Sequence, residues 1–430
     1  MRFYIRNIGR IAKANLLLNG ITIIVGDNNL GKTTSGRALY TFFNSLYRID
    51  REVGFQRNVQ IKKLIRRFFE KFRRPFSDYV VIHEAINRFL SEPENQGCEI
   101  RNYVSSHLMH RASPIEVDSL MMSIEEVKNW SNTAVRKQII RDYFDSIFSG
   151  QTIAVDYASE GGSVSAEING HNVSVDFSGD NVSYESDINI QHNAFFIDSP
   201  DLLNHWGRYQ YAGGRNVMLG LSHSLRRAIN SALFDDENPV NKAFENLLFT
   251  ERYNKFINEV SEIMKGHFEF DSNGILRFNE SLDGREEAPI FELDNVSEGI
   301  KAFGVIELML KYRIFSDGDV LIFDEPEIHL HPEWQLKYAR LLVKLQQEFN
   351  LTILITTHSS NFLMATQFFA KLEGREEVVN AYRIKQSEKN KRYSVVESAE
   401  HSGFDDAYIS FIHAAQELDE IRKKAYENEG

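Results

Sequence analysis

The chain has 430 residues, of which 42% are hydrophobic and 12% aromatic, a composition typical of a globular protein with a large core. Its formal net charge of −12 argues against a protein that coats nucleic acid through its overall field. The single cysteine, Cys98, excludes an internal disulfide and a cysteine-based zinc site. The N-terminus lacks a signal-peptide core and no apolar run reaches the ~20 residues of a membrane span, so we expect a cytoplasmic protein without a membrane partner.

The first fifty residues predict short strands followed by a helix. Residues 3–8, 16–18 and 21–25 have strand patterns, and Gly9 and Asn19-Gly20 separate them. The third of these segments is apolar and β-branched on both faces, which indicates a buried central strand. The pattern turns helical at residue 32, and residues 55–145 are mostly helical with many charges.

The period of the pattern changes again in the middle of the chain. The segments 152–155, 164–168 and 173–177 each have the residue alternation of a strand, and turn-forming residues separate them, which predicts an antiparallel meander. Residues 195–198 resemble a buried strand. Helices are expected at residues 219–234 and 240–265, with two short strands around Asn273-Gly274.

After residue 292 helices and strands alternate, which predicts a largely parallel sheet covered on both faces. Strands are expected at residues 320–323 and 351–356. Four helices are expected: one that begins at residue 299, one at 333–349, one that begins after residue 358 and one at 405–428. The sequence therefore predicts six segments: 1–50 and 291–400 as two parts of one core, 51–150 as a helical insertion, 151–200 as an antiparallel β subdomain, 201–290 as a helical region with short strands, and 401–430 as a C-terminal helix.

A glycine-rich loop follows the first buried strand. Gly26, Gly31, Lys32 and Thr33 fit the P-loop pattern between a strand and a helix. Glycines allow successive backbone N–H groups to face phosphates, and the helix adds its positive end. We expect Lys32 to bind the β- and γ-phosphates of ATP and the Thr33 hydroxyl to bind Mg²⁺. The remaining loop residues expected to contact the nucleotide are Asp27, Asn28, Asn29 and Thr34.

Two adjacent carboxylates, Asp324 and Glu325, end the apolar run of residues 320–323. Buried carboxylates are costly, so we expect both at the exposed end of the strand, where a P-loop protein binds its nucleotide. Asp324 would then hold Mg²⁺ and Glu325 would act as the general base on the attacking water.

Two further motifs are weak signals alone and are interpreted from their position in the chain relative to Asp324 and Glu325. Ser297 and Gly299 lie just before a helix, in the segment preceding the apolar–acidic strand, although Ser-x-Gly is also an ordinary helix cap. His358 follows the next strand, where a polar cluster again faces the nucleotide, and we interpret it as a catalytic histidine.

The order and the sequences of these motifs resemble those of the ABC-type ATPase heads of the SMC/RecF/OLD group. The segments that carry the resemblance are Ile5-Arg6-Asn7-Ile8-Gly9, the P-loop, Ser297-Glu298-Gly299, Asp324-Glu325-Pro326-Glu327-Ile328-His329-Leu330-His331-Pro332 and Thr356-Thr357-His358-Ser359. The resemblance covers about the first fifty residues and residues 290–365. It implies an α/β fold: an ABC-type P-loop ATPase head with a mostly parallel core sheet, an antiparallel β subdomain and a helical insertion.

The resemblance also implies how the site is completed. In such heads the P-loop of one subunit faces the signature sequence of a second, so Ser297 and Gly299 would contact ATP bound to the partner, and the chain would form a homodimer or a higher homo-oligomer. The segment after Pro326 stands in the place of the D-loop, and His358 in that of the switch histidine. The signature departs from Leu-Ser-Gly-Gly, and the Q-loop glutamine stays open between Gln191 and Gln56.

Two other features have competing interpretations. His329 and His331, with His358 near them in the sheet, suggest a metal site, but the D-loop accounts for them better. Residues 60–76 form a basic amphipathic helix, which predicts either a solvated cationic face or a docking surface for nucleic acid or an acidic partner. Its basic residues are Lys62, Lys63, Arg66, Arg67, Lys71, Arg73 and Arg74.

Three functional classes fit these motifs. The first is an ATPase that controls a separately encoded effector, a nuclease or toxin, in bacterial antiphage defence, similar to the ATPases of Septu-type (PtuA) and PARIS-type (AriA) systems. The second is a RecF- or SMC-like DNA-repair or chromosome-maintenance ATPase, and the third a transporter's nucleotide-binding subunit. Only about seventy residues follow His358, too few for the nuclease domain of true OLD proteins, which favours the first class.

Overall fold

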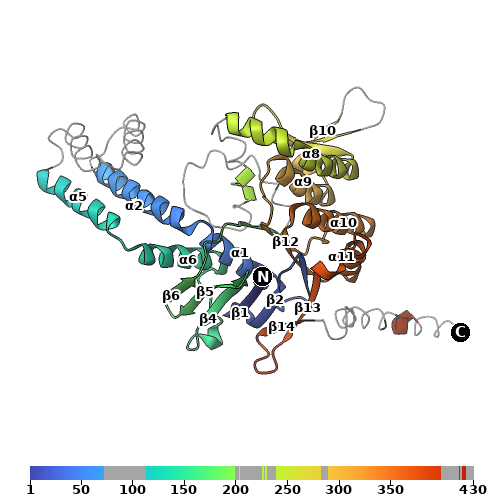
Figure 1. Ribbon diagram of the computed structural model, residues 1–430, viewed down its shortest axis with the longest axis horizontal. Helices are drawn as coiled ribbons and strands as arrows, with labels where there is room; N and C mark the ends of the chain where they lie inside the picture. The colour runs from blue at the N-terminus through green and yellow to red at the C-terminus, as the bar shows by residue number, and fades with distance from the viewer. Residues whose placement is uncertain are drawn as a thin grey trace. The chain divides into compact units, whose positions relative to one another are not determined.

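The computed structural model describes residues 1–71, 113–198, 203, 225–226, 228–229, 239–281, 289–398, 416 and 419–422, and the side chains of these except 69–70 and 239–250. The chain forms two compact units, Met1–Tyr47 with Asp142–Gly430, and Arg48–Arg141 (Figure 1). In the described ranges, none of the helices combines the length and the apolar character that crossing a bilayer requires. The helices expected at 219–234 and 405–428 fall largely outside the described residues.

Five parallel strands form the half of the main sheet that carries the motifs. Their order is β13 (Val379–Gln386), β3 (Ile21–Val25), β12 (Thr352–Thr357), β11 (Val320–Asp324) and β7 (Ala194–Ile197). Every residue of β3 is buried, as its two-sided apolar pattern predicts. Val25 pairs with Thr357, and Asp324 with Thr356, so the loops after β3, β11 and β12 emerge at one edge of the sheet.

Among the described residues, six more strands continue the same sheet beyond β13. The order is β14 (Ser394–Ser398), β2 (Ile11–Leu17), β1 (Arg2–Ile8), β4 (Gly162–Ile168), β5 (His171–Ser178) and β6 (Asn181–Ser186). From β13 to β6 the neighbours are paired antiparallel except for β14 with β2, which are parallel. The meander predicted at 151–200 is therefore joined to the main sheet through the pairing of β1 with β4. The strand expected at 152–155 is wrong: Ile153 makes one isolated bridge, and η2 (Val155–Tyr157) begins where Val155 is 75% exposed.

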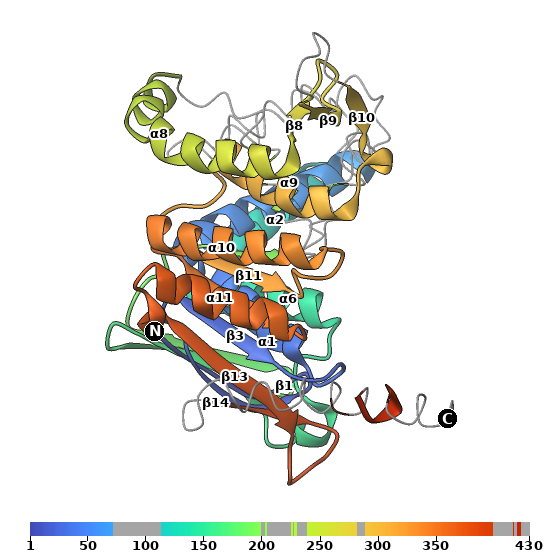
Figure 2. The ribbon, with the colours of Figure 1, turned by 90° about the vertical axis from the view of Figure 1, so that its right-hand side faces the viewer.

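Helices cover both faces of the parallel strands. Helix α1 (Lys32–Leu46) lies on one face, where Gly36 approaches Phe196 and Ile322. On the other face α9 (Glu298–Lys311), α10 (Pro332–Phe349) and α11 (Ser360–Leu372) are stacked (Figure 2). Their apolar residues join Leu321, Phe323 and Ile355 in one core. The apolar run of β11 is thus buried between two helical layers, and only its last residue reaches the polar edge.

Helix α9 also forms part of a smaller layer with α8 (Pro239–Met264) and an antiparallel sheet. That sheet contains β8 (Gly266–Phe270), β9 (Leu276–Glu280) and β10 (Ile290–Glu292), and η4 (Leu293–Asn295) leads from it into α9. A Cβ atom at Gly304 of α9 would lie 2.2 Å from the Phe268 ring, so the glycine permits this close approach. The short helix η5 (Glu376–Val378) connects α11 to β13.

The second unit is helical. Helices α2 (Ile49–Lys71) and α5 (Pro114–Lys128) lie alongside each other (Figure 1), and α6 (Asn132–Phe148) contributes residues to both units. Ile61 and Ile65 of α2 and Leu120 of α5 are buried. A capping box between Ser113 and Glu116 begins α5.

Candidate active site

The P-loop leaves β3 and ends at α1, as its motif predicts. Gly26 has φ 153° and Gly31 has φ 100°. A Cβ atom at Gly26 would lie 2.5 Å from Cγ2 and 2.8 Å from the carbonyl oxygen of Ile384 on β13, so a larger residue would displace the loop. No side chain caps the start of α1 at Gly31. The helix therefore presents free backbone N–H groups and its positive end to the loop.

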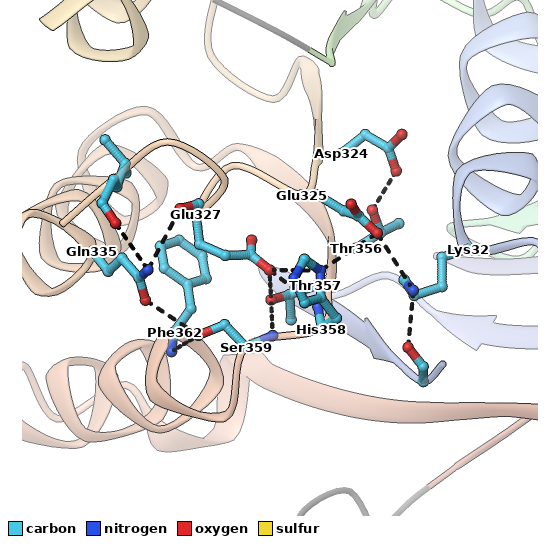
Figure 3. A network of polar contacts seen from close by, with 12 residues as sticks. Lys32, Asp324, Glu325, Glu327, Gln335, Thr356, Thr357, His358, Ser359 and Phe362 are labelled. Atoms are coloured by element: carbon cyan, nitrogen blue, oxygen red, sulfur yellow. Dashed lines mark hydrogen bonds and ion pairs between the residues drawn. The ribbon is translucent and has the colours of Figure 1, made fainter. Parts of the chain in front are cut away.

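Lys32 is only 4% exposed and curls back over the loop. Its Nζ donates hydrogen bonds to the carbonyl oxygens of Gly26 at 2.9 Å and Asp27 at 3.1 Å. The same nitrogen lies 3.4 Å from Oε1 of Glu325 (Figure 3). This cation is consequently held between the loop and the carboxylate that the sequence predicts as the base.

Asp324 connects three elements at the sheet edge. Its Oδ1 accepts hydrogen bonds from the hydroxyls of Thr33 on α1, at 3.1 Å, and Thr356 on β12. Burial raises the pKa of Asp324, while these hydroxyl donors and nearby Arg37 oppose the rise. The two predicted Mg²⁺ ligands are thus side by side. Their hydroxyl and carboxylate oxygens suit Mg²⁺, which binds one or two protein oxygens together with waters and phosphates.

Glu325 adopts a left-handed backbone conformation with φ 52°, which is uncommon for a residue other than glycine. Its N–H donates to the carbonyl oxygen of Thr356 at 2.9 Å, which fixes this turn against β12. Such strain is found where a side chain must be aimed at a reacting group. Glu325 is thereby directed toward Lys32 and His358 rather than along the strand (Figure 3).

His358 lies after β12 with 45% of its side chain exposed. Its Nδ1 is 3.6 Å from Oε1 of Glu325 and 3.5 Å from Oε1 of Glu327. The structure thus places the predicted base and the predicted catalytic histidine side by side. Glu327, which the sequence motifs named only as part of the D-loop segment, is the second carboxylate at this ring.

Asp198 is a site residue that the sequence reasoning missed. It directly follows β7 and, with Asp324, Glu325 and His329, lines a cavity of about 120 Å³ under α9. The signal was present, because an apolar run that ends in a carboxylate is the pattern that identified Asp324. Arg10 was also missed: its Nη1 donates to Oδ1 of Asn29 in the P-loop at 2.5 Å, a proximity set by the β1–β2 turn and not visible in any motif.

Of the two suggested Q-loop glutamines, Gln191 does not lie at this edge. Gln191 precedes β7, whose Ala194 pairs with Val320 at the start of β11, so it lies at the end opposite to Asp324. Gln56 belongs to the second unit and donates to Glu52 in its own helix at 2.7 Å.

Ser297 caps α9 and accepts a hydrogen bond from the Ile300 N–H at 3.4 Å. A Cβ at Gly299 would lie 3.4 Å from the carbonyl oxygen of His329, so this end of α9 packs against the D-loop segment. Within the described ranges, no hydrogen bond or ion pair joins either residue to the P-loop of the same chain.

The two D-loop histidines have separate surroundings. His331 caps α10, and its Nδ1 accepts from the Glu333 N–H at 3.4 Å, while His329 has φ 70° and lines the cavity. Across the described part of the chain, no group of three or more His, Cys, Asp or Glu side chains is arranged to hold a metal ion by itself.

The basic residues proposed to bind nucleic acid lie on α2 where the structure describes them. Lys63, Arg66 and Arg67 are exposed and Lys62 is half-buried, whereas Arg73 and Arg74 are outside the described residues. Lys71 pairs with Glu116 of α5 at 2.6 Å. The neighbouring helix α5 is acidic, with Glu116, Asp118, Glu125 and Glu126 along it.

Residues 147–365, just over half of the chain, match the family described as "AAA domain, putative AbiEii toxin, Type IV TA system". The chain belongs to this family. The family match and the parallel core sheet confirm the expected α/β ATPase-head fold class. The matched segment includes Ser297, Asp324 and His358 but not the P-loop. The P-loop is in contact with the matched segment through the hydrogen bond between Thr33 and Asp324. No curated protein matches the chain.

Solved structures of SMC head domains cover most of the chain at low identity. An SMC head domain from Thermotoga maritima is 11% identical with a TM-score of 0.40, covering 93% of this chain and 98% of its own. An SMC head bound to the C-winged helix domain of ScpA is 13% identical with a TM-score of 0.44, covering 93% and 98%. An SMC head with an extended coiled coil, bound to the C-terminal domain of ScpA derived from Pyrococcus furiosus, is 12% identical with a TM-score of 0.40, covering 98% and 98%. At these TM-scores the family assignment rests on the matched segment alone.

Proposed function

We propose that this protein binds and hydrolyses Mg²⁺-ATP, and that ATP closes a dimer which controls a separately encoded effector protein in bacterial antiphage defence. The observation that carries the ATPase proposal is that the P-loop and the Asp324-Glu325 segment, which are far apart in the sequence, lie in contact at the edge of the sheet. Thr33 and Asp324, 291 residues apart, share a hydrogen bond of 3.1 Å, and Lys32 lies 3.4 Å from Glu325.

Each group has a distinct task in this proposal. Lys32 and the N–H groups of the P-loop and α1 bind the phosphates, and Thr33 and Asp324 hold the metal ion, which would neutralise phosphate charge. Glu325, turned toward His358 by its left-handed backbone, accepts the proton of the attacking water. His358 donates a hydrogen bond to the γ-phosphate or orients that water.

We further propose that Ser297 and Gly299 complete the site of a second copy. Both lie beside the D-loop segment at the start of α9, and the positive end of a helix suits a phosphate. A site divided between two copies would make ATP binding and dimer closure one event.

The first test uses two substitutions that separate binding from hydrolysis. Lys32→Ala removes the buried cation, and we expect ATP affinity to fall by at least about 100-fold, because a charged phosphate contact is lost. Glu325→Gln keeps the shape of the site, and we expect nucleotide affinity within about 2-fold of wild type but turnover lowered by about 100-fold or more. Equilibrium binding of fluorescent ATP and phosphate release measure the two quantities.

Glu376→Gln is the matched control, because Glu376 is exposed beside Lys371 and takes no part in the site. Wild-type turnover in Glu325→Gln would remove Glu325 from the role of base. Wild-type ATP affinity in Lys32→Ala would contradict the nucleotide site itself.

The proposed defence role has separate support. The name of the matched family refers to a toxin of a type IV toxin–antitoxin system, and the motif Glu327 to Pro332 resembles OLD-like ATPases. The partner would be a nuclease or toxin whose activity the closed or open dimer restrains. A nuclease or toxin gene beside the gene for this protein would support the assignment.

The alternative is a RecF- or SMC-like ATPase that acts on DNA. It would use the exposed basic residues of α2, among them Lys63, Arg66 and Arg67. The acidic helix α5 alongside α2, and the pairing of Lys71 with Glu116, weaken the field that this surface offers to phosphates. We therefore rank the effector-controlling role first.

A further inference from the structure

Glu327 is a buried carboxylate for which hydrolysis, as described above, assigns no task. It is 4% exposed and lies in the turn after β11, between the predicted base and α10. Burial raises its pKa, which the surrounding hydrogen-bond donors only partly offset. A buried carboxylate costs free energy of folding, so its presence at the site asks for a functional reason.

The contacts of Glu327 all lead to the end of β12. Its Oε1 accepts hydrogen bonds from the Thr357 hydroxyl at 2.5 Å and the His358 N–H at 3.1 Å, and lies 3.5 Å from Nδ1 of the same histidine (Figure 3). Its Oε2 is buried with no hydrogen-bond partner among the described residues. One oxygen of Glu327 thus contacts both the backbone and the ring edge of His358.

Gln335 of α10 holds the same turn from the other side. Its Nε2 donates to the carbonyl oxygens of Leu330 at 3.1 Å and Glu327 at 3.5 Å, and its Oε1 accepts from the Ser359 hydroxyl at 3.2 Å (Figure 3). Ser359 also caps α11. The turn after β11 and the segment after β12 are therefore tied together at two points on either side of His358.

We infer that Glu327 is a positioning residue for His358: its carboxylate fixes the Nδ1 edge of the ring so that the opposite nitrogen, Nε2, faces the bound phosphate. The inference rests on the proposed function for its catalytic consequence, though not for its geometry. A carboxylate that accepts from one ring nitrogen selects the tautomer and orientation of the other. Errors of about 1 Å in a catalytic group cost on the order of 100-fold in rate.

The test uses Glu327→Gln, which keeps an oxygen acceptor for Thr357 and the His358 N–H but removes the Glu327 charge from the ring edge, leaving only the Glu325 carboxylate, 3.6 Å from Nδ1. We expect kcat to fall about 10- to 100-fold with KM for ATP within about 2-fold, because positioning rather than binding is lost. In a His358→Ala background the same substitution should change kcat by less than about 2-fold, since Glu327 acts through the histidine. Glu376→Gln again serves as the control.

A second measurement does not depend on turnover. The imidazole NMR signals of ¹³C-histidine-labelled full-length protein are recorded without nucleotide, and His358 is assigned by its loss in His358→Ala. Glu327→Gln should shift or broaden the His358 signal, and Glu376→Gln should leave it unchanged.

The outcomes separate the two proposals. Absence of ATPase activity in wild-type protein would overturn the proposed function, while the NMR comparison still decides the role of Glu327. An unchanged His358 signal, or an equal loss of kcat with and without His358, would show that Glu327 does not position the ring. A large fall in Tm with no change in the signal would assign it a purely structural role.

Discussion

At the scale of single residues, Glu307 shows how α9, the helix that Ser297 caps, is anchored. It is 1% exposed on α9, and its carboxylate accepts from the Phe268 N–H of β8 at 2.9 Å and from the Ser261 hydroxyl of α8 at 3.4 Å. Burial raises the pKa of Glu307 to about 7, against an ordinary value of 4.5.

This shift has a definite sign for stability. Between about pH 4.5 and 7 the folded protein keeps the Glu307 proton that the unfolded chain has lost, so the free energy of unfolding falls as the pH rises. The loss from this group amounts to about 3 kcal/mol at most and is complete above about pH 7. We expect Glu307→Gln to match wild type near pH 4.5 and to exceed it in stability at pH 8, as measured by urea unfolding at each pH.

Burial also raises the pKa of other carboxylates, such as Asp319 and Asp324. Their contribution to the pH dependence of the free energy of unfolding is the same in wild type and in Glu307→Gln. The difference between wild type and Glu307→Gln therefore isolates Glu307. A difference that stays constant between pH 4.5 and 8 would contradict the raised pKa.

At the scale of elements, the packing of α9 on β8 depends on one glycine. Ala is favoured over Gly inside a helix by about 1 kcal/mol, yet a Cβ at Gly304 would lie 2.2 Å from the Phe268 ring. Overpacking of this kind costs about 1–3 kcal/mol and the ring is confined by Phe278, so the clash outweighs the propensity gain by up to about 2 kcal/mol. For a chain of this length we expect Gly304→Ala to lower the Tm by about 1–2 °C. Differential scanning calorimetry measures the change.

The control for this prediction is another helical glycine. A Cβ atom at Gly54 of α2 would meet no other atom within 4 Å, so Gly54→Ala should keep the propensity gain of about 0.5–1 kcal/mol. If both substitutions stabilise the protein, the contact of α9 with β8 is looser than the structure shows.

At the scale of the whole molecule, the proposed site needs two copies of the chain. Glu325→Gln with ATP and Mg²⁺ should therefore form a stable dimer, because nucleotide binds but is not consumed. The second substitution Lys32→Ala should abolish this dimer. Light scattering after size-exclusion chromatography measures the mass, and a Glu325→Gln protein that stays monomeric with saturating ATP would contradict a site shared between copies.

Much of this architecture follows from the sequence. Strands β3 and β11 were predictable because a strand covered on both faces has apolar residues at successive positions, here four in each strand. The P-loop and Asp324-Glu325 were predictable because phosphate and Mg²⁺ binding require particular residue types at fixed spacing. The pairing of β1 with β4 was not predictable, since it depends on which distant strands become neighbours. Asp198 carried a signal of its own, the carboxylate at the end of an apolar run, but only the pairing of β7 with β11 shows that it lies near Asp324. The task of Glu327 was hidden for the same reason: its partners Thr357 and His358 are about thirty residues further along the chain.

The arrangement of the parallel strands has a consequence for biosynthesis. Strand β3 pairs with β12 and β13, both from the far end of the sequence, and Thr33 meets Asp324 across 291 residues. At ~5–20 residues per second, a ribosome needs roughly 15–60 s to make that interval. For this time the nascent chain holds a strand of four apolar residues and Thr22 without its neighbours, which exposes it to aggregation, and nucleotide cannot assist folding until synthesis is nearly complete.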